Sequence, residues 1–189
     1  MAFVMSKAQL RREILRKRDH QTESEMQQRS DMILRNLFSV ELVNQAEDIL
    51  LYSDFGSEVR TEGIFQTCKR LRKRTYYPRV EGADLVFYRV EDLSELRVGF
   101  RGIQEPFMLQ RTGGDWIYAA VALVPGTVFS MDGYRIGYGK GFYDRFLARY
   151  PSILKIGLAY SSQMVEQIPV EPHDVRLDGV ITEKDKLFW

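Results

Sequence analysis

The stretch Leu123–Leu147 reads LVPGTVFSMDGYRIGYGKGFYDRFL, and its pattern changes from strand to turn to helix. An apolar run from Ala119 to Val124 is closed by Pro125-Gly126, which is typical of the end of a buried strand. Asp132-Gly133 favours a turn, because glycine readily adopts the positive φ that such turns need. From about Lys140 the aromatic and apolar residues recur at helical spacing. We therefore expect a strand, a glycine-rich loop and a helix in succession.

The loop before this helix has a glycine at every second position, namely Gly137, Gly139 and Gly141. The first N–H groups of a helix have no internal partner, and the helix dipole adds partial positive charge, so the loop suits an anion such as phosphate. Arg135 and Lys140 add full positive charges there. The spacing matches neither the Walker A motif nor the dinucleotide fingerprint. The alternative is a tight connection without a ligand, but the added charges favour a phosphate site.

The same stretch closely resembles the signature of the 5-formyltetrahydrofolate cyclo-ligase (methenyltetrahydrofolate synthetase) family. The family pattern has Pro-Gly, Phe-Asp and then Gly-x-Arg-Leu-Gly-x-Gly-x-Gly-Tyr-Tyr-Asp, and the chain has its counterparts at 125–126, 129–130 and 133–144. It departs at Ser130, Ile136 and Phe142, and Ala120 stands where the family has Asp. The resemblance implies a ligase that uses ATP and Mg²⁺. Such an enzyme converts 5-formyltetrahydrofolate, with or without a polyglutamate tail, to 5,10-methenyltetrahydrofolate and releases ADP and phosphate.

The resemblance also implies which residues do this. ATP contacts are expected at Lys7, Arg11, Arg135, Ile136, Gly137, Tyr138, Gly139, Lys140, Gly141, Phe142 and Tyr143. Folate contacts are expected at Ser53, Glu58, Tyr138, Gly139, Lys140, Gly141 and Phe142, with the segment Phe100–Pro106 beside the cleft. Lys140 and Arg135 are the expected catalytic cations, because phosphoryl transfer depends on charge neutralisation. Asp144 and Asp174 are the expected Mg²⁺ ligands.

Several of these residues have a simpler interpretation. Lys7 and Arg11 are like charges at i,i+4, which is mildly unfavourable without an anion, and spacing alone favours a solvated basic face. If ATP supplies that anion, removing both residues should leave the thermal stability of the ligand-free protein unchanged or slightly higher. Glu58 suits the N–H donors of a pterin ring, or it is a helix-start carboxylate favoured by the dipole. Asp144 suits Mg²⁺, or it pairs with Lys140 one turn away.

Alternating strand and helix patterns predict an α/β domain with a largely parallel sheet. Expected strands cover Asp48–Tyr52, Arg74–Pro78, Leu85–Val90, Ala119–Val124, Leu154–Ala159 and Leu177–Thr182, with a turn at Glu81-Gly82 and irregular structure over Leu96–Asp115. A ligand cleft then lies at the carboxyl ends of the strands, so the loops after Tyr52 and Val124 should face one cleft. The resemblance implies the three-layer fold shared with ribose-5-phosphate isomerase and CoA transferases.

Capping boxes mark the starts of two further helices, one from Lys7 to about Arg18 and one after Thr22. The second helix has a core stripe of Met26, Ser30, Ile33 and Leu37, and a third is expected to turn Ile64, Cys68 and Leu71 inward, with Cys68 as a small core hydrophobe. The basic run Lys69–Arg74 suits a helix C-terminus, and the alternative is a site for a folate polyglutamate tail. His173 has no second ligand spaced for a zinc cage.

The composition bounds the class of protein. A chain of 189 residues with 44% hydrophobic and 28% charged residues predicts one soluble globular domain over residues 1–189. A net charge of +1 gives no whole-molecule field for nucleic acid or membrane. The single cysteine excludes an internal disulfide and suits the cytoplasm, and the N-terminal run is too short for a signal peptide. A phosphosugar isomerase or CoA-transferase-like enzyme and a non-catalytic binder of folate or nucleotide stay open as alternatives.

Overall fold

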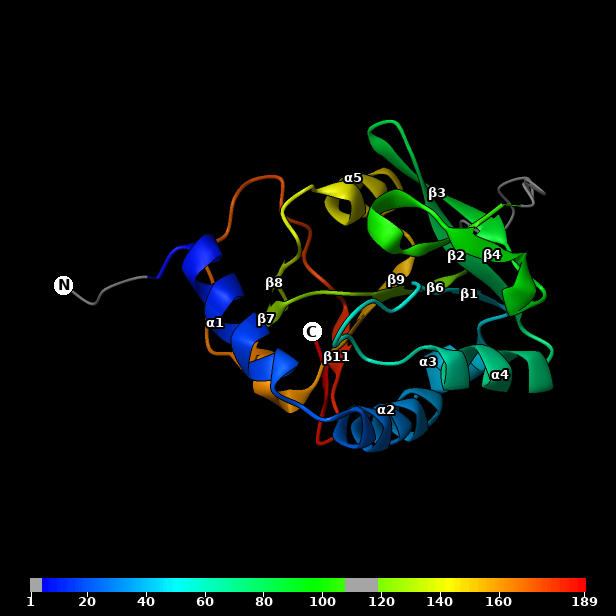
Figure 1. Cartoon of the computed structure of the whole chain (residues 1–189), viewed down its shortest axis with the longest axis horizontal. Coiled ribbons are helices and arrows are strands. Elements are labelled where there is room, and N and C mark those ends of the chain that lie inside the picture. Colours follow the sequence, from blue (N-terminus) through cyan, green and yellow to red (C-terminus); the bar gives the residue numbers. More distant parts are fainter. Residues whose placement is uncertain (1–4, 108–118) are drawn as a thin grey trace.

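A computed structural model describes residues 5–107 and 119–189, and a seven-stranded sheet lies at its centre (Figure 1). The strand order is β12-β11-β9-β6-β1-β2-β3. These strands are β1 (Asp48–Leu50), β2 (Arg74–Glu81), β3 (Asp84–Arg89), β6 (Val121–Val124), β9 (Leu154–Leu158), β11 (Gly179–Ile181) and β12 (Lys186–Phe188). The five inner strands run parallel, while β3 and β12 pair antiparallel at the two edges. The predicted α/β class with a largely parallel sheet is confirmed.

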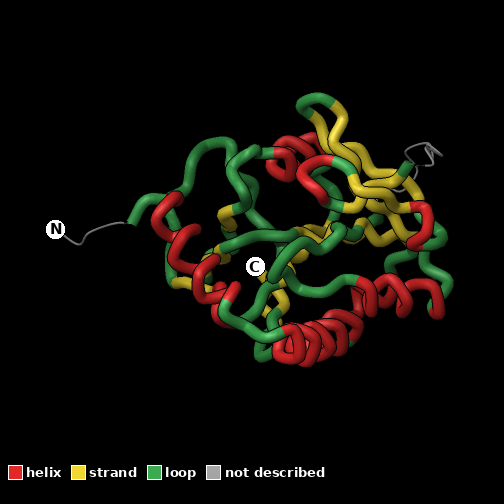
Figure 2. The backbone as a smooth tube through the Cα atoms, in the orientation of Figure 1, coloured by secondary structure: helices red, strands yellow, loops and turns green. Residues whose placement is uncertain are grey.

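Helices cover both faces of this sheet, as Figure 2 shows. Residues of α2 (Glu23–Phe38), α3 (Glu41–Gln45) and α4 (Glu62–Arg70) pack on one face and those of α5 (Phe142–Arg149) on the other, while α1 (Lys7–Asp19) belongs to neither layer. Successive strand side chains point to opposite faces, so Ile49 packs with the core residues of α2 and α4 whereas Leu50 packs with those of α5. The predicted stripe of α2 is fully buried, and both predicted capping boxes are present. These contacts build a layer of helices on each side of the sheet.

The first helix lies apart from these layers, against a small second sheet (Figure 1). That sheet consists of β10 (Met164–Val165), β7 (Val128–Ser130) and β8 (Arg135–Ile136), in this order. Ile14 of α1 packs there against Val128 and Ile136 in a third core cluster. The small sheet was not expected from the sequence, because strands of two or three residues are too short to show a period. It carries the start of the glycine loop to the side of α1.

Two expectations about local structure are wrong. Leu71 is half exposed and not on the inner face, because α4 ends at Arg70 and Leu71 is its C-cap. The described part of Leu96–Asp115 is not irregular: β4 (Leu96–Val98) and β5 (Gln104–Pro106) form an antiparallel pair. The rest of that segment, 108–115, lies outside the described residues. Short 3₁₀ turns complete the fold at η1 (Leu93–Glu95), η2 (Phe100–Gly102) and η4 (Ser161–Gln163).

Cys68 lies in the core, where burial raises the pKa of its thiol to about 12, so it acts as the predicted core hydrophobe. No helix in the part of the chain that the structure describes is long and apolar enough to cross a membrane.

Candidate active site

A cavity of about 370 Å³ opens at the carboxyl ends of β1 and β6, within the size range of ligand pockets. Its walls come from α1, the loop after β1, the β4–β5 segment, the glycine loop with the start of α5, and the loop before β11. Every residue for which the sequence predicted a ligand contact lines it: Lys7, Arg11, Ser53, Glu58, Arg135, Ile136, Gly137, Tyr138, Gly139, Lys140, Gly141, Phe142, Tyr143, Asp144 and Asp174. The two strand-end loops therefore face one cleft, as expected.

The glycine loop has the backbone that the pattern predicted. Gly139 and Gly141 have φ of 87° and 66°, a region that other residues rarely adopt. Gly141 is also the N-cap of α5, so no side chain caps this helix and it begins two residues later than expected. Arg11 lies against the loop, because its Nε donates to the carbonyl oxygen of Gly137 at 2.7 Å. The arrangement leaves an uncapped helix N-terminus and a guanidinium on the wall of the cavity.

Arg135 and Asp144 form an ion pair inside this wall. Arg135 is 6% exposed, and its terminal nitrogen lies 3.2 Å from Oδ1 of Asp144. The same carboxylate accepts a hydrogen bond from the backbone of Val175 at 3.3 Å. Within the described residues the ion-pair partner of Asp144 is thus Arg135 and not Lys140, whose side chain is exposed at the cavity. The i,i+4 interpretation of Asp144 is wrong, since Lys140 precedes the helix.

Lys7 is not a free surface charge. Its Nζ lies 2.6 Å from a carboxylate oxygen of Asp174 and 2.6 Å from one of Glu171. Burial alone disfavours both charges, but the hydrogen bonds between them outweigh it, so the pKa of Lys7 is raised and that of Asp174 lowered. The interpretation of α1 as a solvated basic face therefore fails for Lys7, which already has anionic partners. The spacing argument missed them because they lie more than 160 residues away.

The loop before β11 also gathers possible metal ligands. Ligand atoms of Glu171, His173 and Asp174 all lie within 4.8 Å of one another. The loop places a carboxylate on each side of His173 in the chain, and the expectation that His173 has no second ligand spaced for a zinc cage stays a prediction. Asp144 and Asp174 both line the cavity, and their carboxylate oxygens are the type of ligand that Mg²⁺ prefers.

Glu58 is the most perturbed carboxyl group of the cavity. It is 5% exposed and accepts a hydrogen bond from the backbone of Phe55 at 3.0 Å. Burial raises its pKa to about 7, although Arg18, the Phe55 N–H and Tyr138 act in the opposite direction. The alternative interpretation of Glu58 as a helix-start residue is wrong, because α4 begins only at Glu62.

Three buried polar atoms in the cavity wall have no hydrogen-bond partner among the described residues. They are Oγ of Ser53, Nε of Arg135 and the hydroxyl of Tyr143. Buried polar groups are nearly always satisfied in native proteins, so unsatisfied ones in a cavity indicate where a polar ligand belongs. All three are residues for which the sequence predicted ligand contacts.

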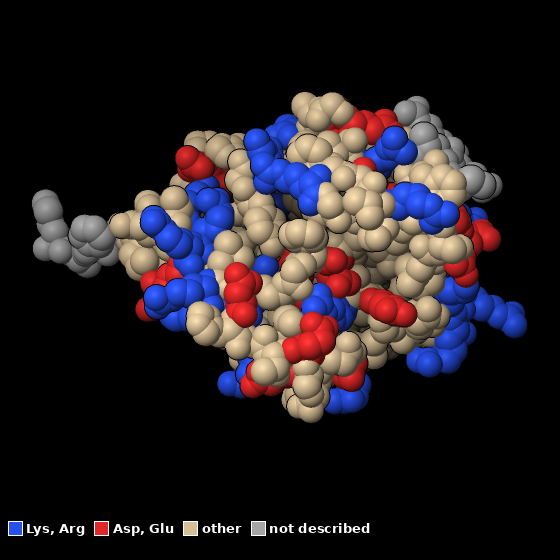
Figure 3. Space-filling model, viewed as in Figure 1, with Lys and Arg blue, Asp and Glu red and all other residues tan. Residues whose placement is uncertain are grey.

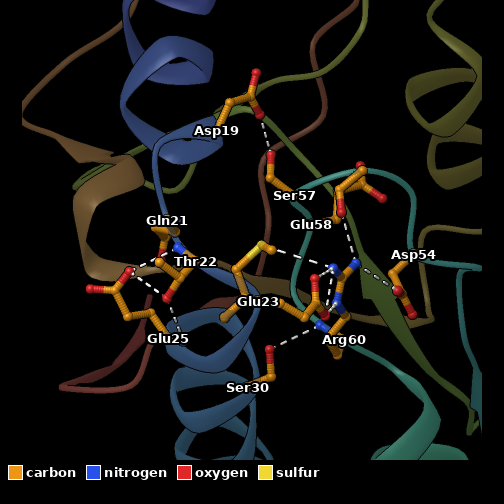
Figure 4. A network of polar contacts seen from close by, with 12 residues as sticks. Asp19, Gln21, Thr22, Glu23, Glu25, Ser30, Asp54, Ser57, Glu58 and Arg60 are labelled. Carbon is orange, nitrogen blue, oxygen red and sulfur yellow. Dashed lines mark hydrogen bonds and ion pairs between the residues drawn. The ribbon is translucent and has the colours of Figure 1, made fainter.

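Two arginines that support the site were missed by the sequence analysis. Arg60 holds the loop after β1, since it pairs with Asp54 of that loop and with Glu23 of α2, as Figure 4 shows. Its backbone N–H also donates to Ser30, which Figure 4 places on α2. Arg18 is buried at the end of α1 beneath the cavity. Arg18 has no sequence signal, because α1 is rich in basic residues and its partners Ser57 and Tyr138 are distant in the chain. Arg60 has none because a single arginine in a loop does not indicate that Glu23 lies beside it.

Comparison with known proteins decides the family. The model of the 5-formyltetrahydrofolate cyclo-ligase family matches residues 4–183. The chain belongs to this family. Its members are ligases, so the predicted family and enzyme class are confirmed. The cyclo-ligase of Haemophilus influenzae is 29% identical over 92% of this chain and 95% of its own length. That of Escherichia coli K12 is 27% identical over 89% and 95%, respectively.

Two solved structures support the same assignment. The NMR structure of 5,10-methenyltetrahydrofolate synthetase from Aquifex aeolicus superposes with a TM-score of 0.86 at 35% identity, covering 97% of this chain and 93% of that one. The synthetase from Mycoplasma pneumoniae superposes with a TM-score of 0.73 at 27% identity, covering 95% and 99%. Folate interconversion is thus the chemistry of this cyclo-ligase family member.

Proposed function

We propose that this chain cyclises 5-formyltetrahydrofolate to 5,10-methenyltetrahydrofolate at the expense of ATP, with Mg²⁺, and releases ADP and phosphate. The observation that carries the proposal is the single cavity in which a positively charged glycine loop faces the buried carboxyl of Glu58. The glycine loop suits the phosphates of a nucleotide, and the carboxyl group of Glu58 suits the N–H donors of a pterin. One cavity with both features can hold the two substrates side by side.

The chemical difficulty is that an amide-like formyl oxygen is a poor leaving group. Transfer of the γ-phosphoryl group to that oxygen converts it into a phosphate, and attack by N10 of the folate then closes the ring and expels the phosphate. Lys140 and Arg135 neutralise the charge on the transferred group, together with the uncapped N-terminus of α5. Lys7 and Arg11 hold the remaining phosphates from the side of α1.

Asp144 and Asp174 are the residues proposed to hold Mg²⁺. When bound, the ion neutralises phosphate charge and orients the phosphates. The ammonium of Lys7 now contacts Asp174, and the guanidinium of Arg135 contacts Asp144. We expect each cation to exchange its carboxylate partner for a phosphate oxygen when the nucleotide binds, which would free the carboxylate for the metal.

We further propose a single domain over residues 1–189, with the three-layer architecture of ribose-5-phosphate isomerase and CoA transferases, acting in the cytoplasm. The basic run Lys69–Arg74 is not among the residues that line the cavity, so the interpretation as helix C-terminal charge is preferred to a polyglutamate site. Lys69 and Arg70 indeed fall in the last turn of α4.

The decisive assay follows ADP and 5,10-methenyltetrahydrofolate together in the presence of Mg²⁺. ADP should appear only when 5-formyltetrahydrofolate is present, in equal amount to the methenyl product. ATP hydrolysis without the folate would reject the proposal, and so would folate binding without ADP formation, which is the behaviour of a non-catalytic binder. Turnover of a sugar phosphate or a thioester without ATP would favour the alternative enzyme class.

A further inference from the structure

The guanidinium of Arg145, near the start of α5, connects the glycine loop to the hairpin between β2 and β3. Its Nη1 donates to the carbonyl oxygen of Lys140 at 2.9 Å. Its Nε and Nη2 both donate to the carbonyl oxygen of Ala83, in the turn of the hairpin, at 3.2 and 2.7 Å. The guanidinium also lies over the ring of Phe142, with Cζ 5.2 Å from the ring centroid. These contacts fix its position, and Figure 1 shows the hairpin beside α5.

Arg145 lies behind the loop and not on the wall of the cavity. Lys140 and Gly141 line the cavity, whereas Arg145 and Ala83 are not among the lining residues. The hydrogen-bond acceptors of Arg145 are carbonyl oxygens, and it has no ion-pair partner within residues 5–107 and 119–189. Lys and Arg side chains gather over the start of α5 on the face that Figure 3 shows. Any effect of the Arg145 bridge on a ligand therefore acts through the glycine loop.

The bond to Lys140 sets the orientation of one peptide group of the loop. In a trans peptide the carbonyl oxygen and the N–H point in opposite directions. Because the carbonyl oxygen of Lys140 points to Arg145 behind the loop, the N–H of Gly141 points to the opposite side. The backbone N–H groups of Gly139, Lys140 and Gly141 have no hydrogen-bond partner in the described part of the chain. Free N–H groups of this kind are the donors that an anion needs.

Glycine leaves this orientation weakly determined unless another group holds it. Gly139 and Gly141 flank Lys140 with φ of 87° and 66°, and glycine changes its backbone conformation at little cost. Rotation of the peptide group between 140 and 141 would turn a carbonyl oxygen to the cavity, where it repels a phosphate. Arg145 opposes this rotation, and its own backbone N–H donates to the carbonyl oxygen of Gly141 at 3.0 Å. One residue thus holds two successive carbonyl groups of the loop.

We propose that Arg145 is a positioning residue of the phosphate site, which holds the carbonyl group of Lys140 so that the N–H of Gly141 faces the phosphates of the nucleotide. This inference rests on the proposed function for the identity of the ligand. It goes beyond that function because it assigns a role to a residue outside the cavity and links the shape of the loop to the hairpin. A planar guanidinium can bridge the carbonyl groups of Lys140 and Ala83, whereas a lysine ammonium lacks this fork.

Calorimetry with ATP in the absence of folate is the first test. Arg145→Met should bind ATP about ten-fold more weakly, the lower end of the effect of a hydrogen bond to a charged group, because Arg145 is exposed. Its affinity for 5-formyltetrahydrofolate should change much less, because Glu58 is untouched. Arg145→Lys keeps the charge but not the bridge, so it should lose nearly as much affinity for ATP as Arg145→Met. Both variants should melt close to the wild type.

The matched control is Arg149→Met, one turn further along the same helix. Arg149 pairs with Asp84 of the same hairpin at 3.1 Å, and its printed contact does not include the glycine loop. This variant removes an equal charge and a contact to the same hairpin, so its affinity for ATP should equal that of the wild type. A loss in Arg145→Met but not in Arg149→Met separates the orientation of the loop from the support of the hairpin.

The amide resonance of Gly141 supplies the second readout. In the wild type, inorganic tripolyphosphate should shift the amide proton of Gly141 downfield, because the N–H then donates to a phosphate oxygen. In Arg145→Met and in Arg145→Lys this shift should be lost. A residue that only stabilised the fold would leave the shift in place in any variant that still folds.

Wild-type affinity for ATP in Arg145→Met overturns the proposal. Wild-type affinity in Arg145→Lys overturns it as well, because the charge and not the bridge would then be the cause. If Arg145→Met does not fold, Arg145→Lys decides: it must lose both the affinity and the Gly141 shift. An unshifted Gly141 amide in the wild type also overturns the proposal. A shifted amide in a wild type that forms no ADP with 5-formyltetrahydrofolate supports the role of Arg145 and rejects the proposed function.

Discussion

The ion pair between Lys7 and Asp174 should stabilise the fold of the ligand-free protein. The sequence alone suggested that Lys7 could be removed without loss of stability. The side chains of Lys7 and Asp174 are 22% and 10% exposed, and the two atoms in contact are 2.6 Å apart. A hydrogen bond between charged groups contributes about 1.5–3 kcal/mol, and an exposed ion pair about 0–1 kcal/mol. Because Lys7 still reaches solvent, we expect a coupling free energy between these values, about 1–2 kcal/mol.

The measurement is a double-mutant cycle on urea unfolding with Lys7→Met, Asp174→Asn and the double variant. In a thermal melt, a loss of about 2 kcal/mol in the free energy of unfolding would lower the Tm of a chain of this size by roughly 4–8 °C. The control is the cycle of Lys17→Met and Glu13→Gln on the same helix, an ion pair of 2.7 Å whose side chains are 53% and 40% exposed. That pair should show a coupling free energy of at most about 0.5 kcal/mol, as is usual for exposed i,i+4 pairs.

The pH of the measurement follows from the pKa shifts. The lowered pKa of Asp174 makes its contribution complete above its ordinary value of 3.8 and lost as the pH falls through the folded-state value. The raised pKa of Lys7 makes its contribution complete below 10.5 and lost as the pH rises through its own folded-state value. Both contributions are complete at pH 7. A Lys7→Met variant as stable as wild type at pH 7 would refute the argument and restore the picture of a solvated basic face.

Three further predictions concern the chemistry. Lys140→Ala should fold normally and lose about 10²–10³-fold in turnover, whereas the exposed Lys184→Ala should retain activity; near wild-type turnover would remove Lys140 from the mechanism. Asp144→Asn should raise the Mg²⁺ concentration for half-maximal rate, and an unchanged titration would make Asp144 only the partner of Arg135. Glu58→Gln should weaken folate binding by about 1.5–3 kcal/mol with ATP binding little changed. Because the pKa of Glu58 rises from 4.5 to about 7 on folding, the wild type loses stability across that range as pH rises. The free energy of unfolding in urea should therefore change less between pH 5 and pH 8 in Glu58→Gln than in the wild type. An equal change in both proteins would contradict this prediction.

The parts of the site that the sequence predicted follow from patterns within the sequence. Gly139 and Gly141 are conformationally necessary where they stand, so the spacing of the glycines alone indicates a backbone that turns into an uncapped helix. The loop after β1 could likewise be placed at the cavity, because the carboxyl ends of adjacent parallel strands meet at one edge of a sheet. The first geometry is determined by neighbours in the chain, and the second by the parallel pairing of β1 with β6, which the alternating strand and helix pattern predicts.

The parts that the sequence missed depend on partners far along the chain. The sequence around Lys7 does not indicate that a loop more than 160 residues away places two carboxylates beside it. In the sequence, nothing distinguishes Arg18 from the other basic residues of its helix. Only the fold shows that it contacts Ser57 and Tyr138. The strands β7 and β8, which carry Arg135 to the cavity, are too short to have a period. Charge partners and short strands are therefore the features that required the three-dimensional structure.

The cavity gathers groups that are unfavourable without a ligand. Glu58 is buried with a raised pKa, and Oγ of Ser53, Nε of Arg135 and the hydroxyl of Tyr143 have no hydrogen-bond partner among the described residues. The two packed helical layers offset this cost, since one covers each face of the sheet that carries the loops. A ligand with N–H donors for Glu58 and phosphate oxygens for Arg135 would remove several of these penalties at once. Binding would therefore be linked to folding stability, because the groups that are unfavourable without a ligand are the ones proposed to bind the two substrates.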